Sequence, residues 1–153
     1  MRSLILCLLL FCAGLAQADD RRSLTIGIPQ FPATMHPLMD ILSVREYITG
    51  FVGRPMTAYD ADWRLVCLLC ETLPSRDNGL IEDIVLADGR AALAVTYRLR
   101  DEHVWGDGTP VSAADAVLAW RIGAHPSAGA ANHDVFANSI IRVEAGADAR
   151  TIR

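Results

Sequence analysis

Acidic side chains beside a histidine are the first residues of this chain whose types could support catalysis. Asp101, Glu102, His103 and Asp107 lie close together in the sequence, and carboxylates paired with a histidine can act as general acid and base. These residues flank a turn, however, where Asp and Glu are usually solvated. The sequence also contains no G-x-S-x-G, H-E-x-x-H or P-loop motif. We therefore predict that the protein is not an enzyme and needs no cofactor.

A C-x-x-C pair, Cys67 and Cys70, is the second candidate for chemistry. In an exported protein such a pair could close a disulfide or exchange thiols with a substrate. The pair stands in an apolar run, 65–71, and free cysteine in a core behaves as a small apolar residue. We therefore expect two buried thiols, with a disulfide as the alternative. A zinc site is disfavoured because it needs four ligands and the histidines lack matching spacing, so we predict no metal.

The start of the chain has the features of a secretory signal peptide, residues 1–18. Arg2 supplies the positive charge, an apolar run extends from Leu4 to Leu15, and Ala16-Gln17-Ala18 is a small-x-small cleavage site. The run is shorter than the about 20 apolar residues that a membrane-spanning helix requires. We expect cleavage and export, and an uncleaved anchor is the alternative.

Charge and length restrict the class of protein further. The formal net charge is −4, and no cluster of basic side chains is present that could neutralise phosphates, so we predict no nucleic-acid partner. The chain has 153 residues, which suffices for one domain by the usual figure of about 100 to 200 residues.

A strand, a tight turn and a helix follow one another in the middle of the chain. Apolar and polar side chains alternate over 93–100, which predicts a half-buried strand. Glycine and proline in 106–110 make the chain bend there. Ser112 and Asp115 have the spacing of a capping box, so a helix should begin at Ala113.

The expected strand is also one arm of a hairpin. Residues 81–87 and 91–100 flank Asp88-Gly89, and an Asp-Gly pair between alternating runs is a strong hairpin signal. Trp105 follows this strand and Trp120 lies on the expected helix, so we predict that both are core residues rather than ligand contacts.

The remaining segments carry weaker signals. Residues 41–52 have apolar side chains at helical spacing and predict a short amphipathic helix. The other expected elements are a strand at 23–28, irregular chain at 31–39, a turn at 57–63, a brief apolar helix or turn at 65–71, a loop at 123–131, a helical turn at 132–138 and a strand at 140–144.

The strand, turn and helix in the middle of the chain carry a resemblance to a known family. Its residues here are Trp105, Asp107, Gly108, Thr109, Pro110, Ser112 and Asp115. The block closely resembles the signature region of extracellular solute-binding proteins of family 5, the oligopeptide and dipeptide type, which deliver peptides, and sometimes nickel complexes or sugars, to ABC importers. Residues 34–37, 54–63, 65–71 and 143–153, the last looking like the opening of a further strand, are similar to this family in its usual order.

The resemblance implies an α/β fold of mixed α+β character with a mixed sheet. Residues 19–153 would form the N-terminal part of the first lobe of a two-lobed, type II-like periplasmic binding protein. Lobes of such proteins close on their ligand by hinge motion. Because the family has a second lobe, we expect this chain to be a fragment of a longer gene product. A truncated remnant that no longer binds solute is the alternative.

The resemblance also implies a function. The protein would be periplasmic, bind peptides or similar small solutes, and present them to ABC permease subunits in the inner membrane. By position in the family, the irregular stretch 35–45 would contact the ligand, and within it we select Ser43 and Arg45. Main-chain hydrogen bonds would hold a peptide there. The competing interpretation is a secreted α/β interaction or thiol-redox module that uses Cys67 and Cys70.

Overall fold

The computed structural model describes residues 23–153 and divides the chain into two units, Met1–Phe31 and Pro32–Arg153. The expected signal peptide, 1–18, lies outside the described residues. The described part of the first unit carries no helix or strand, so the strand expected at 23–28 is wrong. A strand is held by hydrogen bonds to a neighbouring strand, and no segment of the described chain pairs with this one.

Helix α2, Ser43–Val52, is the first regular element of the second unit and confirms the predicted helix. The chain before it is irregular, as expected, and the Asp40 carboxylate accepts a hydrogen bond from the Leu42 N–H at 2.8 Å just before the helix begins. The helix ends at Gly53, whose N–H donates to the carbonyl oxygen of Thr49. A Cβ at Gly53 would lie 2.9 Å from that oxygen, so the close contact requires glycine.

A hairpin of two short strands, β1 (Thr57–Tyr59) and β2 (Leu65–Cys67), follows α2. The strands pair in antiparallel register, with Thr57 opposite Cys67. The helix or turn expected at 65–71 is therefore wrong for the first residues of that segment. Asp60 explains the difference: its carboxylate accepts hydrogen bonds from two N–H groups of the turn, at 2.8 and 2.9 Å. This turn returns the apolar run alongside β1, where it pairs as a strand.

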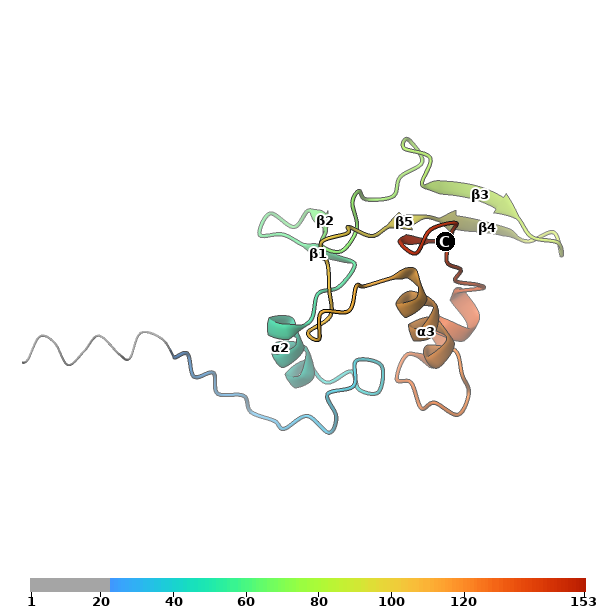
Figure 1. Cartoon of the computed structure of the whole chain (residues 1–153). Coiled ribbons are helices and arrows are strands. Elements are labelled where there is room, and N and C mark those ends of the chain that lie inside the picture. The colour runs from blue at the N-terminus through green and yellow to red at the C-terminus, as the bar shows by residue number, and fades with distance from the viewer. Residues whose placement is uncertain (1–22) are drawn as a thin grey trace, which may run out of the picture. The chain divides into compact units, whose positions relative to one another are not determined.

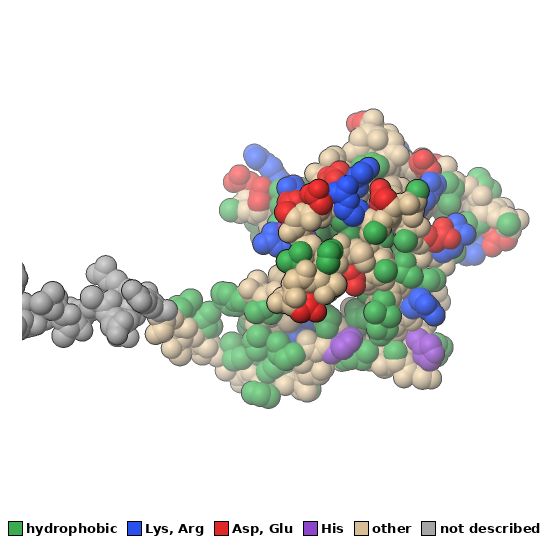
Figure 2. All heavy atoms as spheres, in the orientation of Figure 1, with side chains coloured by type: hydrophobic (Ala, Val, Ile, Leu, Met, Phe, Trp, Pro, Cys, Tyr) green, Lys and Arg blue, Asp and Glu red, His purple; other side chains and the backbone are tan. Residues whose placement is uncertain are grey.

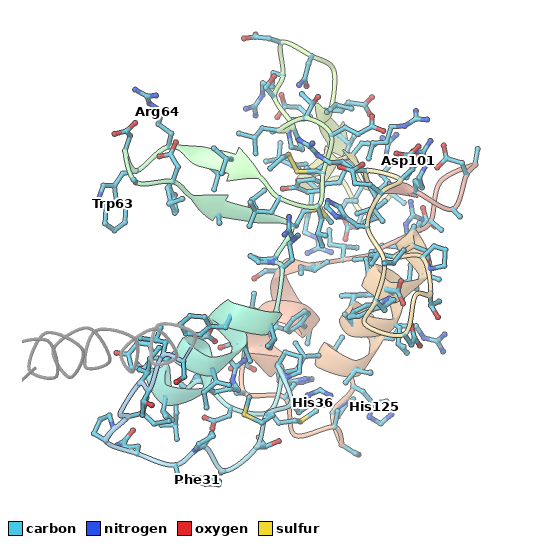
Figure 3. All side chains as sticks on the ribbon, turned by 60° about the vertical axis from the view of Figure 1, so that its left-hand side comes forward. Phe31, His36, Trp63, Arg64, Asp101 and His125 are labelled. Atoms are coloured by element: carbon cyan, nitrogen blue, oxygen red, sulfur yellow. A yellow bond between two sulfur atoms is a disulfide. The ribbon has the colours of Figure 1, made fainter. Side chains whose placement is uncertain are left out.

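Trp63 occupies an unusual backbone position in this turn. Its φ is +59°, and no other non-glycine residue of the described chain has a positive φ. The side chain is 82% exposed and projects outward with Arg64 from the end of the hairpin (Figure 3). A left-handed conformation costs a side chain with a Cβ about 1–2 kcal/mol, so this turn stores strain that no burial of the indole offsets.

Replacing Trp63 with glycine is expected to give a more stable protein than replacing it with alanine. Both substitutions remove the indole, but only glycine adopts the positive φ without strain. After allowing for the greater freedom of glycine in the unfolded chain, we expect the Trp63→Gly variant to exceed the Trp63→Ala variant by about 1 kcal/mol. Urea unfolding of the two variants measures this difference. An alanine variant as stable as the glycine variant would contradict the strain.

The predicted hairpin around Asp88-Gly89 is confirmed. Strands β3 (Ile81–Val85) and β4 (Ala91–Val95) are antiparallel, with Ile81 opposite Val95. Gly89 has a φ of +85°, which only glycine adopts freely. Charged side chains of both signs intermingle over this region (Figure 2).

Several of these charged side chains form exposed ion pairs with one another. Arg76 donates to both carboxylate oxygens of Asp83, at 2.9 and 3.0 Å, and these hydrogen bonds lower the pKa of Asp83. The backbone N–H and guanidinium of Arg90 likewise lower the pKa of Asp88. Exposed pairs of this kind contribute little to stability, so the hairpin depends mainly on its backbone ladder and its half-buried apolar side chains.

The predicted strand 91–100 changes partner along its length. After Val95 the chain continues as β5 (Tyr97–Arg98), which pairs in antiparallel fashion with β6 (Thr151–Ile152). The β6 strand confirms the strand expected there. No strand forms at 140–144, so the strand expected there is wrong. In the described chain, this segment pairs only through two backbone hydrogen bonds between Glu144 and Arg153, next to a single bridge at Ala145.

Helix α3, Ala113–Gly123, begins where the capping box predicts. A loop follows, as expected, and the predicted helical turn is present as a π-helix, η2, Val135–Ser139. Gly123 lets these elements pack together, because a Cβ there would lie 2.5 Å from the Phe136 ring. Trp120 is half-buried, and its indole N–H donates to the Ile140 carbonyl oxygen at 3.3 Å. A core position for Trp120 is thus partly confirmed.

The second unit is a mixed α+β fold. Its strands form three two-stranded sheets, and every named pair is antiparallel, so the expected mixed sheet is wrong for the described residues. The β1–β2 and β3–β4 hairpins lie along one side and the helices along the other (Figure 1). Leu99, Ala113 and Ile152 form the buried core between them. Among residues 23–153, no helix is long and apolar enough to cross a membrane.

Candidate functional site

A pocket with a volume of about 410 Å³ opens in the second unit. Its buried and half-buried lining is mostly apolar. The apolar members are Met56, Leu69, Leu99, Val111, Ala116 and Ile152, and the polar ones are His103, Ser112 and Asp115. These residues come from the chain after α2, from the chain after β2, from the segment between β5 and α3, from α3 itself and from β6. The pocket is therefore an extension of the core that reaches solvent, and segments far apart in the sequence build it.

Asp115 organises the polar side of the pocket. One of its carboxylate oxygens accepts hydrogen bonds from the Ser112 N–H at 2.7 Å, the Ser112 hydroxyl at 3.1 Å and the Trp105 indole N–H at 3.4 Å. The first of these bonds closes the capping box of α3. The third is longer than a typical N–H···O bond and directs the indole N–H toward the start of α3. The carboxylate is thus already bonded to three donors of its own chain.

Trp105 is not a core residue, contrary to the prediction from its apolar character. The side chain is 52% exposed and lines the pocket. The physical reason lies in the chain between β5 and α3: a turn at residues 101 and 102 interrupts the strand, so the alternation that buries Leu99 does not extend to Trp105. The bond to Asp115 then holds the ring beside the pocket.

Residues 107–110, in the turn of the signature region, contact Trp105 through the backbone and do not line the pocket. The Trp105 N–H donates to the Thr109 carbonyl oxygen at 2.8 Å, and the Gly108 N–H donates to that of Trp105 at 2.9 Å. Gly108 has a φ of +88°. The Thr109 N–H lies 2.9 Å from the Asp107 carboxylate and lowers the pKa of Asp107. Asp107, Gly108, Thr109 and Pro110 are therefore structural residues of the turn.

Arg54 and His103 bring basic groups to the pocket. Arg54 is exposed, and in the described part of the chain no carboxylate forms an ion pair with it. His103 is half-buried, with its Nε2 atom 2.9 Å from the Leu68 carbonyl oxygen. Sequence reasoning noted His103 only as part of an acidic cluster and gave Arg54 no role. The only local signal for Arg54 is its place directly after a helix-ending glycine.

The acidic cluster beside His103 does not assemble into a catalytic arrangement. Asp101 pairs with Arg150 at 3.6 Å, and Glu102 pairs with Arg100 at 3.7 Å. Each of these two carboxylates thus faces its own arginine, while the His103 Nε2 atom lies at the Leu68 carbonyl oxygen. The group that sequence proximity suggested is thus divided among independent surface contacts.

Ser43 and Arg45, the predicted ligand contacts, do not line the pocket. Ser43 is exposed at the first residue of α2. Arg45 is 6% exposed; its Nε donates to the Asp40 carbonyl oxygen at 3.1 Å, and its guanidinium pairs with Glu46. The contact of Ser43 and Arg45 with a ligand stays a prediction.

Cys67 and Cys70 are joined in a disulfide, so the expectation of two free thiols is wrong. The chain bends directly after β2 and brings the two Cα atoms to 5.1 Å, within the range of about 4.4–6.8 Å that a disulfide spans. Cys70 has no exposed surface. Thiol exchange needs at least one accessible sulfur, so an attacking thiolate could reach this bond only at Cys67, which is half-buried.

The antiparallel hairpins and the capped helix form a fold that is also found in a solved structure. The structure matches that of an oligopeptide binding protein from Thermus thermophilus, solved in complex with a pentapeptide, with a TM-score of 0.62 and 20% sequence identity. The match covers 77% of this chain and 19% of that protein. The resemblance predicted from the sequence is thereby confirmed at the level of the fold. No protein-family model and no curated protein matches the chain.

Proposed function

We propose that this chain belongs to the substrate-binding component of an ABC importer and takes part in binding peptides or similar small solutes. The observation that carries the proposal is the shared fold with the oligopeptide binding protein. The chain corresponds to a small share of that protein, so residues 19–153 would be one portion of a larger binding domain. The protein would act in the periplasm after removal of residues 1–18 and would deliver its ligand to permease subunits in the inner membrane.

The pocket supports a binding role. Ligand sites are typically concave and mostly apolar, with few polar groups that fix orientation, and their volumes are about 300–1,000 Å³. The pocket of about 410 Å³ has an apolar lining and a small number of polar groups. Trp105 supplies a fixed aromatic surface. These features suit a ligand that is recognised by shape and by one or two polar contacts. Ser43 and Arg45 lie outside this pocket and would contact another part of the ligand.

Peptide binding can be tested on the exported protein as its gene encodes it. We expect pentapeptides to raise its thermal unfolding temperature, because a ligand that binds only the folded state stabilises it by about 2.7 kcal/mol at one hundred times Kd. The matched control is a mixture of the same free amino acids, which should have no effect. A protein that unfolds cooperatively at the same temperature with and without a broad peptide library would contradict the proposed function.

A further inference from the structure

We propose that the pocket beside Trp105 binds the C-terminal residue of a peptide, with its apolar side chain inside the pocket and its carboxylate on Arg54. This inference rests on the proposed function and adds to it the end of the peptide that the pocket selects. The pocket volume of about 410 Å³ lies near the lower end of the range for ligand sites. It therefore suits part of a peptide rather than an entire pentapeptide.

The first argument is the shape and polarity of the lining. Leu99 and Ile152 are 2% and 7% exposed and form the innermost wall. Val52 and Val104 also line the pocket but remain 81% and 56% exposed. An apolar side chain that entered the pocket would cover them, and each Å² of apolar surface removed from water contributes about 25 cal/mol. The lining thus favours a large apolar side chain over a small or polar one.

The second argument is the fixed orientation of Trp105. Its indole N–H is bonded to Asp115, and the turn behind it is closed by two backbone hydrogen bonds. The ring is therefore positioned before any ligand arrives, although half of its surface faces solvent. A preorganised aromatic surface loses little conformational entropy on binding. Aromatic and aliphatic side chains both pack well against such a ring.

The third argument is electrostatic and decides which end of the peptide fits. The lining contains one carboxylate, that of Asp115, and three donors from Ser112 and Trp105 bond to one of its two oxygens. Part of its negative charge is therefore already compensated within the chain before any ligand arrives. Arg54 lacks an ion-pair partner among residues 23–153, and a guanidinium binds a carboxylate through two parallel hydrogen bonds. Arg54 is thus the charge at the pocket that lacks a partner in residues 23–153, which favours the C-terminal carboxylate over the N-terminal ammonium.

Three alanine-based pentapeptides test this inference by calorimetric titration of the exported protein. The first ends in phenylalanine, the second ends in glycine, and the third is the C-terminal amide of the first. We expect the first peptide to bind at least tenfold more tightly than either of the others, because the glycine peptide lacks the side chain and the amide lacks the charge.

Arg54 can then be assigned by substitution. The Arg54→Gln variant should bind the acid and the amide equally, with the affinity of the wild type for the amide. Arg121 is the matched control: it is exposed on α3 and does not line the pocket, so Arg121→Gln should keep the preference for the acid. Both variants should unfold at the wild-type temperature because both side chains are exposed.

The outcomes separate this inference from the proposed function. Peptides that bind with equal affinity as acid and amide, or with equal affinity whatever their last residue, would overturn the C-terminal pocket and leave peptide binding intact. An acid preference that survives Arg54→Gln would overturn the role of Arg54. Absence of binding by every peptide to a folded protein would overturn both proposals together.

Discussion

Replacing Leu99 with alanine is expected to lower the free energy of unfolding by about 3 kcal/mol. Leu99 is 2% exposed and forms the core with Ala113 and Ile152. The substitution removes buried methyl groups and leaves a cavity that its neighbours fill only in part. The total stability of a domain is about 5–15 kcal/mol, so the loss is a large share. Few fully buried side chains support this core, which leaves little to compensate.

Leu118 provides the matched control for Leu99. It undergoes the same chemical change in Leu118→Ala, but its side chain is 56% exposed on α3. We expect this variant to stay within about 0.5 kcal/mol of the wild type. Urea unfolding followed by far-ultraviolet circular dichroism measures both variants. Equal losses at the two positions would show that the core does not centre on Leu99.

The sequence predicts those helices and strands that are held by contacts between residues a few positions apart in the chain. The β3–β4 hairpin forms around Asp88-Gly89 because glycine alone adopts the required φ freely. Helix α3 begins at Ala113 because Ser112 and Asp115 satisfy its first N–H groups. In both cases residues within a few positions of one another make the decisive contacts. The resemblance to solute-binding proteins rests on this same stretch and is confirmed at the level of the fold, whereas the mixed sheet that it implied is wrong.

Elements that depend on a distant partner could not be predicted in this way. Residues 65–67 are a strand because β1 lies beside them, and residues 140–144 are not one because almost no ladder forms there. Both segments contain apolar and β-branched side chains, so composition does not separate them. Whether a short apolar run becomes a strand depends on its neighbour in space, which its own sequence does not specify.

The pocket could be predicted least of all. Arg54, Trp105 and Ile152 meet there from separate parts of the chain, and none of them belongs to a motif with a chemical role. The apolar character of Trp105 predicted burial, yet its hydrogen bond to Asp115 holds it at the surface. The sequence showed Asp115 only as a helix cap. Its hydrogen bond to the Trp105 indole depends on a turn that brings Trp105 close to the start of α3.

Breaking the disulfide is expected to be the second largest effect on stability. The bond closes a loop from Cys67 to Cys70, and in the chain-entropy account a loop this short contributes about 2 kcal/mol. The Cys67→Ala variant, whose altered residue is half-buried, should lose about that amount. The Cys70→Ala variant should lose more, because its sulfur is fully buried and a cavity adds to the lost cross-link.

Reduction separates the bond from the side chains that form it. Dithiothreitol should lower the stability of the wild-type protein to that of Cys67→Ala and should leave both variants unchanged, because neither can form the bond. Urea unfolding with and without the reductant measures this, and titration of free thiols in the native protein provides an independent check. Two titratable thiols together with no effect of dithiothreitol would contradict the disulfide. That result would support buried thiols, which the apolar surroundings of the pair favour when the sequence is read alone.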